Sequence, residues 1–151
     1  HTGMLRSGRI YVEKLESPKR NVVIVDDDAR LLNFPNEYEK AVRRVREVIP
    51  DVKFIVPKQL SRASLMNLMK DAKVVYDDCM VGSERVPMES CLFGAIIVTN
   101  HCNVGSRFAD IPSPSALRLE GVPDTDITAY TDAFVKTLWM TSYPRDFIFR
   151  L

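Results

Sequence analysis

The chain has 151 residues, of which 46% are hydrophobic and 27% are charged, and these values are ordinary for one globular domain with a single core. They exclude a disordered or collagen-like chain. The 21 Lys and Arg residues balance 20 Asp and Glu residues, so the net charge is +1, without the basic excess that nucleic acids or anionic membranes attract. No apolar run approaches the roughly 20 residues that span a bilayer, so neither a nucleic-acid partner nor a membrane span is expected.

The cysteine content and the first residues of the chain bear on its setting. The three cysteines are odd in number and show no metal-ligand spacing: Cys79, Cys91 and Cys102. Because no signal-peptide pattern is visible either, the sequence predicts an intracellular, cytoplasmic protein with reduced thiols. Residues 1–3, before Met4, are typical of the remnant of a cleaved tag, so we expect residues 4–151 to form one domain.

The first half of the chain alternates between β-branched runs and amphipathic segments. A buried strand is expected at Val22–Val25, followed by a helix that Asn36 opens and Pro50 stops. The apolar stripe of this helix, which we expect to face the core, comprises Tyr38, Ala41, Val42, Val45, Val48 and Ile49. A second strand is expected at Val52–Val56, and Ser61 is suited to cap the next helix.

The second half continues the alternation. The expected elements are a strand at Val74–Tyr76, a helix around Pro87–Phe93 that Gly94 stops, a strand at Ala95–Val98, a short strand at Ala116–Leu119 and a helix from about Asp126 to Met140. This pattern predicts an α/β, Rossmann-like fold, a doubly wound parallel sheet of about five strands with helices on both faces. Such sheets bind ligands beyond the carboxyl ends of their strands.

Residues 77–100 carry the pattern that most suggests a ligand site. A loop with Gly82-Ser83-Glu84 leads into a helix that has a carboxylate at Glu89. Free backbone amides at the start of the helix and at Gly82-Ser83 can face a diphosphate. Glu89 can accept hydrogen bonds from two vicinal ribose hydroxyls, and Glu84 can accept them from sugar hydroxyls. These residue types therefore suit a nucleotide sugar.

Together with Ala72-Lys73-Val74-Val75 before them and the strand Ala95–Val98 after them, these residues resemble the donor-binding half of GT-B glycosyltransferases. Those enzymes pair two Rossmann-like domains and bind the nucleotide sugar mainly on the C-terminal one. The resemblance implies that residues 4–151 are a donor-binding domain from a longer protein with a second domain on its amino side. It further implies a metal-independent transfer from a nucleotide-diphosphate donor, such as a UDP-sugar, to an acceptor that the sequence does not identify. No other cofactor is expected, and the isolated domain is expected to be incomplete as an enzyme.

The resemblance also assigns residues. In the family, the glutamate before the glycine holds the ribose, which falls to Glu89, and an upstream acid meets the sugar, which falls to Glu84. The remaining expected donor contacts are Gly82, Ser83, Arg85, Asn100 and Arg30, with Arg62, Arg85 or Arg107 as options for a second diphosphate cation. The two glutamates lie closer together than in many relatives, and Ala95 replaces a common proline. No residue is assigned to catalysis.

Asp26-Asp27-Asp28 supports a different interpretation. Clustered carboxylates after a first strand are typical of a response-regulator receiver, which holds Mg²⁺ beside a phosphorylated aspartate. Asp77 or Asp78 would then be the phosphoacceptor and Thr99 the switch hydroxyl. The short stretch after Asp78, and Arg118 where a lysine is expected, weigh against it. A GT-A metal motif, a plain strand end in solvent, and a domain kept only for protein contacts also remain open.

Overall fold

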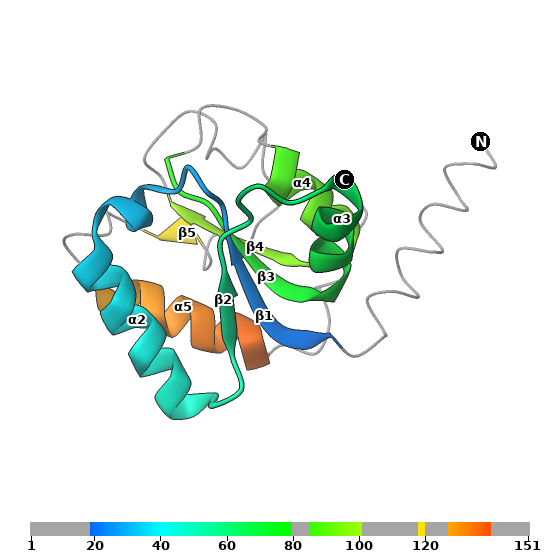
Figure 1. Cartoon of the computed structure of the whole chain (residues 1–151). Coiled ribbons are helices and arrows are strands. Elements are labelled where there is room, and N and C mark those ends of the chain that lie inside the picture. Colours follow the sequence, from blue (N-terminus) through cyan, green and yellow to red (C-terminus); the bar gives the residue numbers. More distant parts are fainter. Residues whose placement is uncertain (1–18, 80–84, 101–117, 120–126, 140–151) are drawn as a thin grey trace.

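The computed structural model describes residues 19–79, 85–100, 118–119 and 127–139, and the fold is given for these ranges (Figure 1). Its elements in chain order are β1 (Arg20–Val25), the 3-10 helix η1 (Arg30–Asn33), α2 (Pro35–Val48), β2 (Lys53–Ile55), α3 (Arg62–Asp71), β3 (Ala72–Tyr76), α4 (Arg85–Leu92), β4 (Ile96–Asn100), β5 (Arg118–Leu119) and α5 (Ile127–Trp139). Every element except η1 overlaps one expected from the hydrophobic pattern.

The strands form a parallel sheet in the order β2-β1-β3-β4-β5. Strands β1 to β4 make its body, whereas β5 contributes only two residues beside the end of β4. Chain progression reverses between β1 and β3, which is the switch in strand order of a doubly wound sheet. The predicted α/β class is confirmed, but the expected fifth strand is reduced to Arg118–Leu119 at the edge.

Helices α3 and α4 cover one face of the sheet (Figure 1). Ile24, Val75 and Ile97 point to this face and pack with Met69 of α3 and Cys91 of α4. All five are buried, and the side chain of Cys91 lies in the core. A buried cysteine in this position acts as a small apolar side chain.

Helices α2 and α5 cover the opposite face, where the core is aromatic. The ring of Phe134 on α5 meets the rings of Phe54 and Tyr76 edge-on, with centroids 5.3 and 5.4 Å apart. Tyr76 also meets Tyr130 at 5.7 Å. Edge-to-face contacts of this kind add to the free energy gained by burying the rings, so α5 is fixed against the middle of the sheet.

Helix α2 shows where the expected apolar stripe was too wide. Ala41, Val45 and Ile49 are buried and spaced four residues apart, so they face the sheet. Val48 was expected in the same stripe, but 49% of it is exposed. Each residue turns the helix by about 100°, which moves Val48 off the line that its neighbours follow.

The ends of the described helices agree with their capping residues. The Ser64 N–H donates to Ser61 Oγ at 3.1 Å at the start of α3, which confirms the predicted cap. Gly94 follows α4 with φ of 93°, a left-handed conformation that suits glycine and ends the helix.

Within the described residues, no helix is long and apolar enough to cross a membrane.

Candidate functional site

Three polar residues lie at one level along the carboxyl edge of the sheet. The Asp26 N–H donates to the Tyr76 carbonyl at 2.9 Å, and the Asp77 N–H donates to the Val98 carbonyl at 3.3 Å. The pairing of β1, β3 and β4 therefore continues one residue further, and Asp26, Asp77 and Thr99 stand side by side. Because side chains alternate along a strand, all three point to the face covered by α3 and α4.

Asp26 and Asp77 form a buried carboxyl pair. Their exposed fractions are 6% and 1%, and a side-chain hydrogen bond joins them. Burial raises the pKa of Asp26 to about 6, and the negative charge of Asp28 adds to this rise. The Asp27 N–H, which donates to Asp26 Oδ1 at 2.8 Å, acts in the opposite direction. Asp26 therefore retains its proton to a higher pH than exposed carboxyl groups do.

The neighbouring groups extend this acidic edge. Carboxylate oxygens of Asp26, Asp27 and Asp28 lie within 4.8 Å of one another, an arrangement that could hold a metal ion, and the last two residues are exposed. Thr99 is fully buried, and its hydroxyl has no hydrogen-bond partner in the described part of the chain. The acidic residues that the receiver interpretation needs are thus brought to the same edge.

Asp78 has a structural role at this edge. Its Oδ1 accepts the Arg30 N–H, and its Oδ2 accepts the Leu31 N–H at 3.1 Å and the Tyr76 hydroxyl at 2.6 Å. Burial raises the pKa of Asp78, and these hydrogen bonds oppose the rise. Because both oxygens are occupied and the residue is 2% exposed, Asp78 holds the first turn of η1 against β3.

Asn100, expected among the donor contacts, lies inside the fold on the α5 side. Its Oδ1 accepts the Cys79 N–H at 2.8 Å, and its Nδ2 donates to the Tyr130 hydroxyl at 3.5 Å. Asn100 thereby supports the turn at Cys79, whose φ is 51°. Cys79 is disulfide-bonded, so the expectation of reduced cysteines is wrong for this residue.

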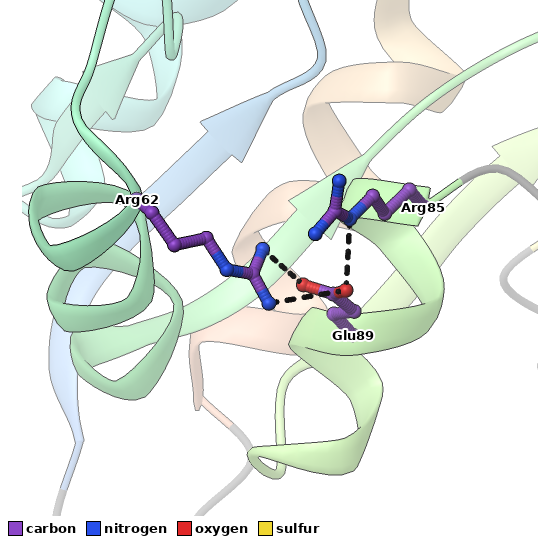
Figure 2. A network of polar contacts seen from close by, with 3 residues as sticks. All are labelled: Arg62, Arg85 and Glu89. Carbon is purple, nitrogen blue, oxygen red and sulfur yellow. Dashed lines mark hydrogen bonds and ion pairs between the residues drawn. The ribbon is translucent and has the colours of Figure 1, made fainter.

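Glu89 lies between two arginines from different helices. Arg62 Nη1 donates to Glu89 Oε2 at 2.9 Å, and Arg62 Nη2 donates to Oε1 at 3.4 Å. Arg85 Nε donates to Oε1 at 3.0 Å. Figure 2 shows the carboxylate between the two guanidinium groups, with Arg62 reaching it from α3 and Arg85 from its own helix. We call these three residues the arginine cluster.

The position of the arginine cluster makes it electropositive. Arg62 is the first residue of α3 and Arg85 is the first residue of α4, and both helices follow the carboxyl end of a strand. The amino end of a helix carries a partial positive charge and disfavours cations. Here two cations and two helix ends share the single carboxylate of Glu89. The hydrogen bond from Arg62, and after it the one from Arg85, lower the pKa of Glu89. An additional anion would therefore be stabilised at this place.

The arginine cluster also has hydrogen-bonding capacity left over. Each guanidinium has five N–H donors, and the contacts to Glu89 use two nitrogens of Arg62 and one of Arg85. Glu89 has about four acceptor positions, of which three are occupied. About half of the Arg62 side chain and 70% of the Arg85 side chain are exposed. The free donors are therefore accessible to a ligand.

The other expected site residues are only partly brought together. Gly82, Ser83 and Glu84 lie outside the described residues, and so does Arg107. Arg30 is exposed at the start of η1, and no described contact joins its side chain to the arginine cluster. Among the described residues, the polar edge at the end of β1 and the arginine cluster are therefore two separate features.

Arg62 is the residue whose role the sequence left open. It was one of several options for a diphosphate cation, and the structure identifies it as the partner of Glu89. Its place directly after the cap Ser61 is a usable signal, because a first-turn arginine stands at the carboxyl edge of the sheet.

Comparison of the chain with protein-family models, with curated proteins and with solved structures finds no match.

Proposed function

We propose that this chain is the donor-binding domain of a GT-B type glycosyltransferase and that it binds a nucleotide-diphosphate sugar. The observation that supports this most is the arginine cluster, because it gathers two cations and two helix amino ends at the carboxyl edge of a doubly wound sheet. A diphosphate carries charge that this environment favours. The helix that holds Glu89 is also the one to which the resemblance assigns donor contacts.

Donor binding by this cluster is an exchange of partners. Glu89 has about one acceptor position free, whereas two vicinal ribose hydroxyls need two. We therefore expect the donor diphosphate to take over at least one arginine, which releases an oxygen of Glu89 for the second hydroxyl. The arginines move to a stronger anion and the glutamate to neutral hydroxyls, so no charge is left without a partner.

In the reaction, the arginines would stabilise the charge that develops on the leaving nucleotide diphosphate. This is electrostatic stabilisation by groups that are already positioned, and it needs no group from the sugar acceptor. In this proposal, a second domain of a longer protein binds the acceptor and closes the cleft. The isolated chain is therefore expected to bind the donor weakly and to transfer sugar poorly.

Thermal unfolding in the presence of ligands tests the proposal. UDP, GDP and their sugars should each be added to the wild-type chain and to Glu89→Ala, Arg62→Ala and Arg85→Ala. At least one nucleotide diphosphate should raise the melting temperature of the wild type, because a ligand that binds only the folded state stabilises it. The rise should be lost in the three variants.

The pair Arg43 and Glu39 supplies the matched control. It joins the same side-chain types at 3.3 Å on α2, away from the proposed site. Arg43→Ala and Glu39→Ala should keep the nucleotide response. Absence of a response to every nucleotide diphosphate, or a response that survives in all three cluster variants, would contradict the proposal.

A receiver-like signalling domain is the second candidate function. The observation that favours it is the row of Asp26, Asp77 and Thr99 on three neighbouring strands at the switch in strand order. Because hydrogen bonds within the fold occupy both carboxylate oxygens of Asp78, Asp77 is the candidate phosphoacceptor. This reading places an Mg²⁺ ion on the acidic edge, where Asp26, Asp27 and Asp28 offer ligand oxygens.

A second titration separates the two candidates. Mg²⁺ with a small phosphoryl donor such as acetyl phosphate should be added to the wild type and to Asp27→Asn and Asp77→Asn. A Mg²⁺-dependent rise in melting temperature that Asp27→Asn removes, with a phosphorylated species that Asp77→Asn removes, supports the receiver function. A nucleotide response alone, with no Mg²⁺ response, rejects it.

A further inference from the structure

A groove runs between α2 and α5, on the side of the molecule away from the arginine cluster. Its volume is about 800 Å³, and Val48, Val135 and Trp139 line it. Trp139 is the single tryptophan of the chain and is 65% exposed. An exposed tryptophan beside an exposed valine is a contiguous apolar surface, which proteins usually cover with a partner.

The groove is also lined by four charged side chains, two on each helix: Arg44 and Glu47 on α2, and Asp132 and Lys136 on α5. None of the four has an ion pair or a side-chain hydrogen bond in the described ranges. On another side of α2, by contrast, Arg43 pairs with Glu39 at 3.3 Å. The charges around the apolar surface are therefore available to a partner.

The order of these charges makes the groove complementary to a second copy of itself. Helices α2 and α5 both run from the carboxyl edge of the sheet to its amino edge. Helix α2 leads from the end of β1 to the start of β2. Tyr130, near the start of α5, contacts Asn100 at the end of β4, and Leu138, near the end of α5, accepts a hydrogen bond from Lys73 near the start of β3. Along α2 the cation comes before the anion, and along α5 the anion comes before the cation.

A two-fold rotation that lays α2 of one copy on α5 of another brings unlike charges together. Arg44 then faces Asp132 of the second copy, and Glu47 faces Lys136 of the second copy. The contact is isologous, so each pair occurs twice. Val48 and Trp139 are the last residues of α2 and α5, beyond Glu47 and Lys136, so the same rotation places the apolar contact at the end of the interface next to the charge pairs.

We propose that the groove between α2 and α5 is the contact surface of a symmetric homodimer that buries Trp139 of each copy. Eight residues line the groove, whereas a stable interface has about 20–30 on each side, so the dimer is expected to dissociate at micromolar concentrations. This proposal is independent of the proposed function, because the arginine cluster lies on the opposite face of the sheet.

Sedimentation velocity and tryptophan fluorescence over a dilution series test the dimer. The wild type should dissociate on dilution, and the emission of Trp139 should shift to longer wavelength in the same range. Trp139→Ala should raise the dissociation constant about tenfold or more. A monomer at all concentrations, or emission at short wavelength that does not change on dilution, would overturn the proposal, because the second result means that the same chain covers Trp139.

Charge-reversed variants test the pairing itself. Arg44→Glu with Lys136→Glu makes the rim acidic, and Glu47→Lys with Asp132→Lys makes it basic. Each double variant alone should be monomeric, and an equimolar mixture should form a heterodimer. As a matched control, Arg43→Glu with Arg46→Glu changes the same charge on α2 outside the groove and should leave dimerisation intact. A dimer that persists in each reversed variant alone overturns the pairing.

Discussion

Arg62 and Glu89 are 27 residues apart in the chain, and hydrogen bonds of 2.9 and 3.4 Å join them across α3 and α4. The contact links the first residue of one helix to the second turn of the other. Such a pair can serve the stability of the fold, the binding of a ligand, or both. The free energy that it contributes to folding separates these roles.

We expect the Arg62–Glu89 pair to contribute little to stability. The Arg62 side chain is 50% exposed, so water screens the attraction, and exposed pairs are typically worth about 0.2–1 kcal/mol. A double-mutant cycle with Arg62→Ala and Glu89→Gln, measured by urea denaturation, should give a coupling within that range. The cycle for Arg43 and Glu39 supplies the control. A coupling above about 2 kcal/mol would make the contact a structural one.

Asp26→Asn should make the protein more stable at neutral pH. The pKa of Asp26 is about 6 in the folded state and 3.8 ordinarily, so the folded state binds the proton more tightly. The stability that this proton contributes is complete below the ordinary pKa and is lost as the pH rises through about 6. Converted at 1.36 kcal/mol per unit, ionisation costs at most about 3 kcal/mol.

Urea denaturation between about pH 4 and pH 7 measures this effect. The variant, which stays neutral, should gain stability relative to the wild type as the pH rises. Parallel profiles for Asp26→Asn and the wild type would show that Asp26 is already ionised in the fold.

Asp78→Ala should be strongly destabilising. The substitution leaves the N–H groups of Arg30 and Leu31 and the hydroxyl of Tyr76 without their acceptor. Buried donors without a partner cost about 1–3 kcal/mol each, so the loss of the acceptor for three donors should lower stability by at least about 3 kcal/mol in urea denaturation. Tyr76→Phe removes one of these bonds and should cost less. Equal effects of the two variants would show that η1 does not depend on Asp78.

Thr99→Val should leave stability unchanged or raise it by up to about 1 kcal/mol. The Thr99 hydroxyl is buried without a hydrogen-bond partner in the described part of the chain, and a methyl group of similar size has no such cost. Thr99→Ser, which keeps the hydroxyl and loses the methyl group, should lower stability by about 1 kcal/mol. The opposite order of the two variants in thermal or urea unfolding would reveal an unrecognised partner.

Much of the fold could be predicted because its signals are local. The β-branched runs around Val23 and Val75, the cap at Ser61 and the glycine after α4 each depend on a few neighbouring residues. The widths of the apolar faces were less certain, as the exposure of Val48 shows, since a stripe in the sequence does not say what packs against its margins.

The site was predicted less completely. Glu89 was singled out by its place in the chain, but its partner Arg62 belongs to a different helix, and only the packing of α3 against α4 brings them together. The same holds for Asp26 and Asp77, which depend on the pairing of β1 with β3. Asn100 was expected to face a ligand, and the structure shows it supporting the turn at Cys79.

By itself, the sequence determined a domain-sized α/β chain with nearly balanced charge, because composition, hydrophobic period and capping residues act over short distances. Only the tertiary structure decided which charges meet: two arginines on one glutamate at one edge, and on the other face, around Trp139, four charges that have no partner among the described residues. A net charge of +1 conceals both arrangements. Electrostatic interactions depend on distance in space, and the packing of the helices on the sheet sets that distance.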